Sequence, residues 1–243
     1  MKEAFQNNAT GSFEDIYFHL RQKEGRVYTD GEVAELPDIS NEHPLYQEWM
    51  IRKRSADKLV SYLTQKKTSL SILEVGCGNG WLTAKLADIP GSDITGIDVN
   101  EYELQQAGKV FGKKENLRFY LCHLQDEIMY NKDFDIIVFA ASIQYFFSLD
   151  GILNNALHHL NRKGEIHIID SPFYKQKEFT SAKQRSLEYF ESAGSPEMND
   201  HYFHHSLEDL KYFNSRFIYN PHSISLYFVK NKKPFHHICI QHG

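Results

Sequence analysis

The chain has 243 residues, which is enough for one α/β domain with an appendage and short for two independent hydrophobic cores. Its net charge of −5 and pI near 6.2 give no general attraction to nucleic acid or to an anionic membrane. The basic clusters at residues 52–54 and 230–233 are interpreted as solvated faces. The longest apolar run, residues 136–143, is too short to span a bilayer, and the three cysteines have no CxxC spacing. We therefore expect a cytoplasmic protein without a nucleic-acid or membrane partner.

Residues 1–67 are expected to form an N-terminal helical extension. Turn-forming residues at 28–31 and 36–38 interrupt its first part, and a longer helix opens after residues 43–44. Tyr46 and Trp49 lie on the apolar face of that helix. Such an aromatic stripe usually packs in a core, and a place beside a bound substrate is the alternative.

The most informative stretch is residues 70–81, where an apolar run enters a glycine-rich turn. The run predicts a buried strand, and residues 81–87 after the turn have helical spacing. Gly76, Gly78 and Gly80 permit positive φ angles and leave room for a ligand close to the backbone. A strand, a glycine turn and a helix N-terminus together predict a nucleotide-type cradle.

Two residues indicate which ligand this cradle suits. A dinucleotide fingerprint has the form GxGxxG, and its third glycine is replaced here by Trp81. Glu74 would lie near an anionic pyrophosphate, whereas the sulfonium and ammonium of S-adenosylmethionine favour a nearby acid. The pattern E-x-G-x-G-x-G at residues 74–80 closely resembles motif I of the class I S-adenosylmethionine-dependent methyltransferases. An NAD-dependent oxidoreductase is the rival hypothesis, and both residues count against it.

The next two predicted strands carry further cofactor candidates. Residues 93–99 form a short apolar run that ends in Asp98, and an acid at this place in a βαβ unit can accept from both ribose hydroxyls. The resemblance implies the same role, and a solvated turn aspartate is the alternative. Past the third strand, at residues 116–122, many relatives have an aspartate that binds adenine, and this chain has His123. The adenine contact stays open between the His123 ring and the backbone around Leu124.

The fourth predicted strand, residues 134–142, is almost wholly apolar, as in a parallel sheet covered on both faces. Its C-terminal end should face the methyl group, because open α/β sheets bind ligands beyond the carboxyl ends of their strands. The NPPY-type sequence of related base and glutamine N-methyltransferases is missing there. A helix capped by Ser148 and ending near residues 161–164, then a strand at 164–170, resemble the type 11 subgroup.

From residue 171 to 213 the composition becomes polar and aromatic, with a helix expected at about 178–192 and a break at 194–196. The resemblance implies a substrate lid in this insertion. The terminal segments at 216–219, 223–229 and 235–241 provide the last strands, and we expect the first and third to form a closing antiparallel pair.

The predicted fold is therefore α/β, with a Rossmann-like, doubly wound, mostly parallel sheet of seven strands. Residues 1–67 form a helical extension or cap, and residues 68–243 form a class I methyltransferase domain with a lid insertion at about 171–213. The cofactor candidates lie in the glycine turn and at the strand ends: Glu74, Gly76, Cys77, Gly78, Asn79, Gly80, Trp81, Asp98, Val99, His123, Leu124, Ala140 and Ser142.

The predicted activity is in-line methyl transfer from S-adenosylmethionine to a small-molecule acceptor, such as a metabolite or a sugar. Alignment of the two reactants supplies most of the rate in such a displacement, and a general base helps if the acceptor is a hydroxyl. The catalytic residue stays open, with Tyr145, His204 and His205 as weak candidates. No metal is expected, because neighbouring His204 and His205 diverge and lack a partner at ligand spacing. A catalytically silent cofactor-binding module is the alternative.

Overall fold

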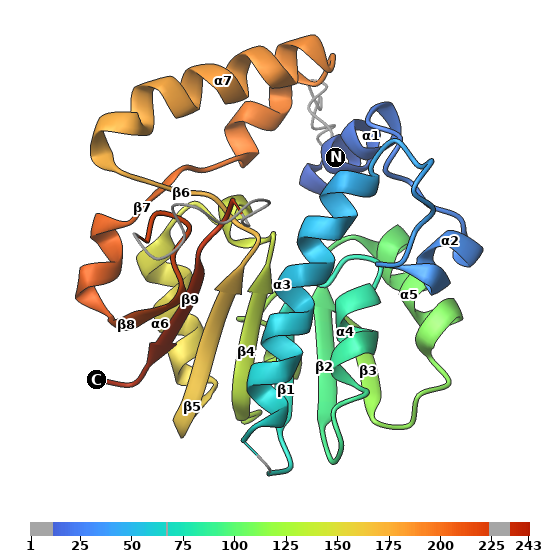
Figure 1. Cartoon of the computed structure of the whole chain (residues 1–243), viewed down its shortest axis with the longest axis vertical. Coiled ribbons are helices and arrows are strands. Elements are labelled where there is room, and N and C mark those ends of the chain that lie inside the picture. Colours follow the sequence, from blue (N-terminus) through green and yellow to red (C-terminus); the bar gives the residue numbers. More distant parts are fainter. Residues whose placement is uncertain (1–11, 67, 224–233) are drawn as a thin grey trace, which may run out of the picture.

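The computed structural model describes residues 12–66, 68–223 and 234–243 (Figure 1). Its central sheet has seven strands in the order β3-β2-β1-β4-β5-β9-β8, of which β1 to β5 are parallel and β9 and β8 are antiparallel. The predicted fold class is confirmed, and the first and third terminal segments form the closing pair. The strands are β1 (Ser71–Val75), β2 (Asp93–Asp98), β3 (Leu117–Leu121), β4 (Phe134–Ala140), β5 (Leu160–Ile169), β8 (Asn214–Tyr219) and β9 (His237–Gln241).

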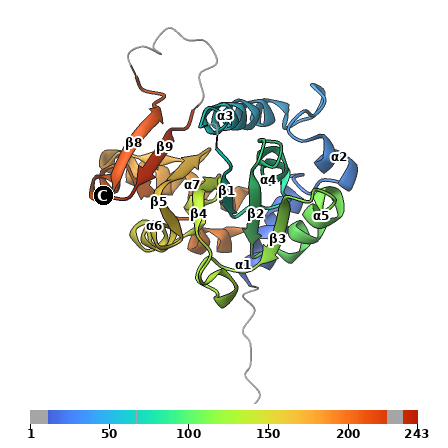
Figure 2. The ribbon, with the colours of Figure 1, turned by 90° about the horizontal axis from the view of Figure 1, so that it is seen from below.

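Helices cover both faces of the sheet, as the continuous apolar strands require (Figure 2). One face packs against α3, α4 and α5, and the other against α6. Ser148 caps α6 by accepting from the Gly151 amide, as the sequence predicts. The helices are α1 (Phe13–Lys23), α2 (Asp30–Glu35), α3 (Tyr46–Thr64), α4 (Trp81–Leu86), α5 (Glu101–Phe111), α6 (Leu149–His158) and α7 (Phe179–Ser192).

Short elements complete the chain. Five 3₁₀ turns and a separate two-stranded parallel pair connect the longer elements within the described residues. They are η1 (Glu127–Met129), η2 (Ile143–Tyr145), η3 (Gln176–Glu178), η4 (Pro196–His201), η5 (Glu208–Tyr212), β6 (Phe173–Tyr174) and β7 (His205–Ser206). In the same part of the chain, every helix is too short or too polar to traverse a bilayer.

Two local predictions were wrong. The turn expected at residues 28–31 is the start of α2, because Thr29 and Glu32 form a reciprocal capping box. The helix end expected at residues 161–164 lies inside β5, which begins at Leu160 opposite Phe134 and absorbs the extra residues in a bulge. The remaining candidate strand, residues 223–229, falls almost entirely outside the described residues.

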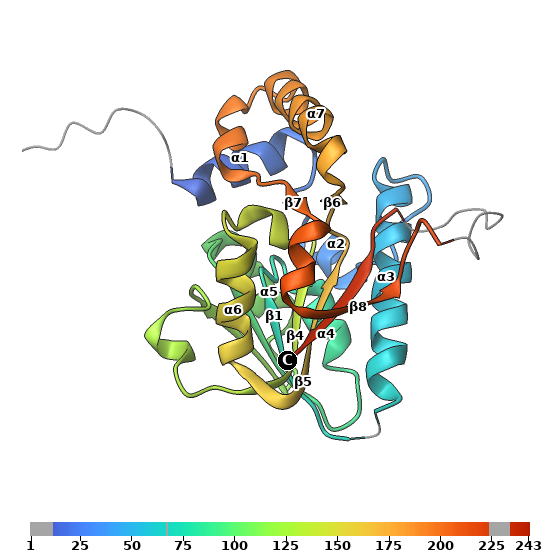
Figure 3. The ribbon, with the colours of Figure 1, turned by 90° about the vertical axis from the view of Figure 1, so that its left-hand side faces the viewer.

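A helical cap, composed of α1, α7 and η4, lies above the carboxyl ends of the parallel strands (Figures 1 and 3). Leu20 of α1 packs with Phe190 of α7 and Met198 of η4 in a small apolar cluster. Lys23 donates hydrogen bonds to the Gly194 carbonyl and to Ser195 Oγ, at the break that follows α7. The cap thus joins segments about 170 positions apart in the sequence.

Candidate cofactor and acceptor site

The glycine turn after β1 has the predicted backbone. Gly76, Gly78 and Gly80 have φ angles of 74°, 53° and 76°. A Cβ at Gly76 would lie 2.6 Å from the Cβ of Ser142, so β1 and the end of β4 approach closely here. A Cβ at Gly80 would lie 2.6 Å from Phe119 and is directed into packing, whereas Gly76 and Gly78 line cavities above the turn.

Glu74 is buried at the end of β1 and accepts a hydrogen bond from Thr83 Oγ1 at 2.6 Å. Burial, with a contribution from nearby Asp98, raises the pKa of Glu74 to about 8. The carboxyl group is therefore mostly protonated at neutral pH when no ligand is bound. A cation in the adjacent cavity would favour its ionised form, which agrees with a cationic ligand.

Asp98 connects the end of β2 to the glycine turn. Its Oδ2 accepts from the Gly78 amide at 2.7 Å and its Oδ1 from the Asn100 amide at 2.8 Å. Burial raises the pKa of Asp98, and these amides oppose that rise. The side chain faces an apolar cavity of about 230 Å³, which is also lined by Val99, Cys122, His123, Leu124, Ser142, Tyr145 and Phe146.

Three cavities meet at the end of β4. The apolar cavity adjoins a polar one of about 90 Å³ above the turn, lined by Glu74, Cys77, Asn79, Trp81 and Ala140, and a larger cleft of about 590 Å³ lies under the cap. Ala141 lines all three. Ala141 and Asp170, at the ends of β4 and β5, both have φ of 53°, a strained conformation for residues other than glycine. Such strain at adjoining strand ends indicates a functional site.

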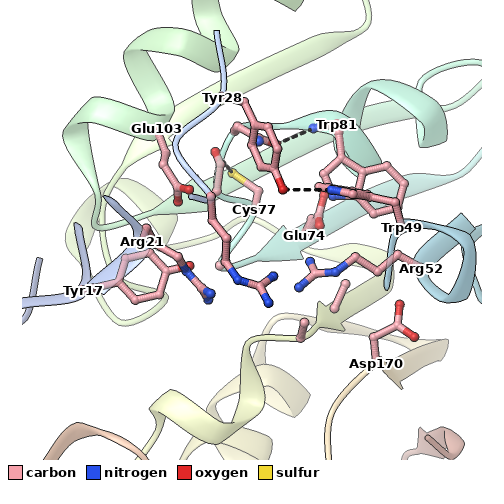
Figure 4. Close-up of a pocket in the computed structure, with 16 residues that line it drawn as sticks. Tyr17, Arg21, Tyr28, Trp49, Arg52, Glu74, Cys77, Trp81, Glu103 and Asp170 are labelled. Atoms are coloured by element: carbon pink, nitrogen blue, oxygen red, sulfur yellow. Dashed lines mark hydrogen bonds between the residues drawn. The ribbon is translucent and has the colours of Figure 1, made fainter. Parts of the chain in front are cut away.

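Arginines from the N-terminal extension complete the polar cavity. Arg21, Arg26 and Arg52 line both this cavity and the larger cleft, and Figure 4 shows the Arg21 and Arg52 guanidinium groups directed toward it. Glu48 receives two hydrogen bonds from Arg26, at 2.5 and 2.6 Å, and one of 2.9 Å from Arg52 NH2. Burial alone would raise the pKa of Glu48, but the two arginines lower it to about 2.

This arginine cluster was not predicted from the sequence, and the interpretation of residues 52–54 as a solvated face was wrong for Arg52. Helical periodicity cannot distinguish Arg52, at the cavity, from its neighbour Lys53, which pairs with Asp38. The cavity-lining Arg21 belongs to the cap, whose position depends on contacts with distant residues. The second basic cluster, at 230–233, lies outside the described residues.

The weak catalytic candidates occupy different surroundings. Tyr145 lines the larger cleft, and its hydroxyl accepts a hydrogen bond from Arg21 at 3.1 Å. His205 is buried and its Nε2 donates to the Ile143 carbonyl, 3.0 Å away. His204 packs against Tyr174 and exchanges a hydrogen bond with a serine of α7. Burial lowers the pKa of both histidines.

The two aromatic residues predicted on the apolar face of α3, Trp49 and Tyr46, also occupy different surroundings. Trp49 lines the polar cavity, donates to the Tyr28 hydroxyl at 2.9 Å and packs edge-on against Trp81 at 5.4 Å. Tyr46 is half-buried. From α3 the larger cleft is lined by Gln47, Glu48, Ile51 and Arg52.

A group of three side chains of the types that bind metal ions lies on β5 and β9. None of the three lines the polar cavity, the apolar cavity or the larger cleft. Potential ligand atoms of Glu165, His167 and Cys239 fall within 4.8 Å of one another. Lys66 and Arg216 already lie 2.9 and 3.2 Å from the Glu165 carboxylate, and their charges oppose a metal ion. Burial would raise the pKa of Glu165, but its polar partners lower it to about 2, as in a structural ion-pair network.

Comparison with known proteins identifies the family. The family model described as "Methyltransferase domain" matches residues 66–212, which is more than half of the chain. The chain belongs to the class I S-adenosylmethionine-dependent methyltransferases. Membership in this family sets the NAD-dependent alternative aside and makes S-adenosylmethionine the cofactor. The glycine turn fits that cofactor, since it leaves space where a Cβ would intrude and places the Glu74 carboxyl group in the lining of the adjacent polar cavity.

Curated relatives of this methyltransferase match part of its length. A malonyl-[acyl-carrier protein] O-methyltransferase from Bacillus anthracis is 31% identical over 47% of this chain and 43% of that enzyme. A ubiquinone biosynthesis O-methyltransferase from Rickettsia akari is 26% identical over 56% of this chain and 50% of that enzyme. The chain therefore spans about half the length of these relatives, or less.

Solved structures show the same fold over more of the methyltransferase. The plantazolicin methyltransferase BpumL, in complex with a triazolic desmethylPZN analog and SAH, has a TM-score of 0.56 and 19% identity, with coverage of 95% of this chain and 97% of that one. The YcgJ protein from Bacillus subtilis has a TM-score of 0.54 and 14% identity, over 67% of this chain and 71% of that one. Both likenesses concern the fold.

Proposed function

We propose that this methyltransferase transfers a methyl group from S-adenosylmethionine to a small molecule held in the cleft beneath the cap. The observation that carries the proposal is the junction at Ala141, which lines the polar cavity, the apolar cavity and the larger cleft. A cofactor that fills the first two cavities would have its reactive centre at the entrance to the third.

The residues suit the two ends of the cofactor differently. The apolar cavity with Asp98, His123 and Leu124 fits the adenosine, and Asp98 accepts from the ribose hydroxyls. The polar cavity fits the amino-acid end, whose carboxylate would bind Arg52 or Arg26. The N-terminal extension would thus contribute an arginine that binds the cofactor's carboxylate. The sequence had predicted no cofactor contact from this extension.

The cofactor supplies the methyl group as an electrophile, and the protein's task is alignment. The ends of β4 and β5 would hold the acceptor in line with that group, beneath the cap that lies over the strand ends. For a hydroxyl acceptor, Tyr145 and Asp170 are the cleft residues placed to bind or receive the departing proton.

The cleft supports a small acceptor with a ring. Its volume of about 590 Å³ is typical of small-molecule sites. Aromatic side chains from the cap and neighbouring segments are among its lining residues, and Gln144, Ser186 and Arg185 add polar groups. The aromatic residues are Tyr145, Tyr174, Tyr189, Phe190, Tyr202 and Phe235. A sugar or another neutral ring compound fits this lining.

A methyl-transfer screen tests the proposal. Formation of S-adenosylhomocysteine is measured first with sugars and other neutral ring metabolites that carry a hydroxyl, because both curated relatives described above are named O-methyltransferases. Arg185→Ala, at the cleft, should raise the KM of an acceptor that turns over, whereas Lys183→Ala, exposed on the same helix, should not. Cofactor binding without turnover across the screen would favour the silent module. Tight, steeply salt-dependent binding to DNA or RNA would contradict a small acceptor.

A further inference from the structure

Glu103 of α5 is a carboxylate in the cofactor site with no role assigned so far. It lines both the polar and the apolar cavity, and Figure 4 shows it beside Cys77 and above Tyr17 and Arg21. Its Oε2 would lie 3.0 Å from a Cβ placed on Gly78, so it borders the ligand side of the glycine turn.

The position of Glu103 in its helix suggests a purely structural role in capping the helix, which the hydrogen bonds do not support. Asn100 caps α5 by accepting from the Glu103 amide, so Glu103 is the residue that would normally bond back to the cap amide in a capping box. That amide donates to Asp98 instead, at 2.8 Å. Among the described residues, no group donates a hydrogen bond to the Glu103 carboxylate.

Charged groups from several elements face Glu103. Burial and the Asp98 carboxylate of β2 raise the pKa of Glu103 to about 7, and Arg21 of α1 and Arg52 of α3 oppose that rise. Arg21 and Arg52 are themselves paired with Glu24 and Glu48. The other titratable groups around this part of the site are Glu14, Tyr17, Arg26, Glu74 and Cys77.

We propose that Glu103 is a specificity-determining residue that favours the cationic S-adenosylmethionine over its neutral-sulfur product, S-adenosylhomocysteine. The two ligands share the adenosine and the amino-acid groups and differ in the methyl group and its positive charge. The Glu103 carboxylate lines both cavities that the cofactor would fill, so it attracts that charge within the site. Methyl transfer removes the charge, so the attraction ends with the reaction and the product is released more easily.

The test is the ratio of the dissociation constants of S-adenosylhomocysteine and S-adenosylmethionine, measured by titration calorimetry at pH 8. Glu103→Gln should lower this ratio at least fivefold, mainly by weakening the binding of S-adenosylmethionine. Glu101→Gln removes the same charge from an exposed position on α5, where Gln105 pairs with it, and should leave the ratio within twofold of the wild type. Glu103→Asp keeps the charge and should preserve the preference for S-adenosylmethionine.

The wild-type protein gives an independent readout. Its ratio should fall as the pH is lowered from 8 to 6, because Glu103 becomes protonated along with Glu74, and the fall should be smaller in Glu103→Gln, which keeps only the Glu74 contribution. Thermal melting of each variant confirms that it is folded. An unchanged ratio in Glu103→Gln would overturn the proposal. Equal weakening of both ligands is one case of an unchanged ratio, and it would mean that Glu103 contacts a group that the two ligands share.

Discussion

The glycine-turn region and the cap differ in how the chain builds them. The turn, Asp98 and the start of α5 lie within about 30 consecutive residues, and backbone amides join them directly. The cap brings α1 together with α7 and η4 across about 170 positions, mainly through apolar packing and the contacts of Lys23. The glycine turn and its contacts with Asp98 are thus specified locally, whereas the acceptor cleft depends on tertiary assembly.

The largest effect is expected in the glycine turn, which is the locally built of the two regions. Gly78→Val should weaken S-adenosylhomocysteine binding more than 100-fold, because Gly78 has φ of 53° and a β-branched side chain would intrude beside Glu103. Titration calorimetry measures the loss. Gly108→Ala in α5, where a Cβ meets nothing within 4 Å, is the control and should bind normally. Normal binding by Gly78→Val would show that the turn does not cradle the cofactor.

A smaller loss is expected at the ribose site. Asp98→Ala removes charge-assisted hydrogen bonds worth about 1.5–3 kcal/mol each, so the affinity for S-adenosylhomocysteine should fall at least tenfold. Asp98→Asn retains an acceptor for the Gly78 or Asn100 amide and should lose less. A dissociation constant unchanged in Asp98→Ala would contradict the ribose assignment.

Arg52 tests whether the N-terminal extension reaches the cofactor. Arg52→Gln should weaken both S-adenosylmethionine and S-adenosylhomocysteine about tenfold, because both carry the carboxylate that Arg52 would bind. Binding of 5′-methylthioadenosine, which lacks the amino-acid part, should not change. Lys53→Gln removes a neighbouring charge that pairs with Asp38 and serves as the control. Equal loss for all three ligands would point to a structural role for Arg52.

The smallest expected effect is a pH dependence of folding. Burial lowers the pKa of His236 to about 4, with smaller contributions from His222 and Lys175. The folded state holds this group neutral while the unfolded chain binds a proton below about pH 6.5, so its stabilisation is complete above that pH and declines as the pH falls toward 4. His236→Gln should therefore reduce the loss of unfolding free energy between pH 7.5 and 5.5 by about 1 kcal/mol. The exposed His158→Gln should behave like the wild type in the same denaturant titrations.

The sequence predicted most of the sheet because its signals are local. Apolar runs marked β1 to β4, and Ser148 caps α6 by accepting from an amide three residues away. The bulge that extends β5 had no such signal, since its register depends on pairing with β4. The places of Arg21, Glu103 and Asp170 at the site were not predicted, because they too depend on contacts between distant parts of the chain. Each lies at a cavity, and only the folded arrangement shows which polar side chains face it.

A crystal structure of the complex with S-adenosylhomocysteine tests the central claim most directly, because it shows both halves of the site at once. We expect the ribose hydroxyls to bind Asp98, the carboxylate to bind Arg52 or Arg26, and the sulfur to lie beside Ala141 and face the cleft under the cap. A ligand bound away from the glycine turn, or a sulfur that faces away from that cleft, would contradict this claim.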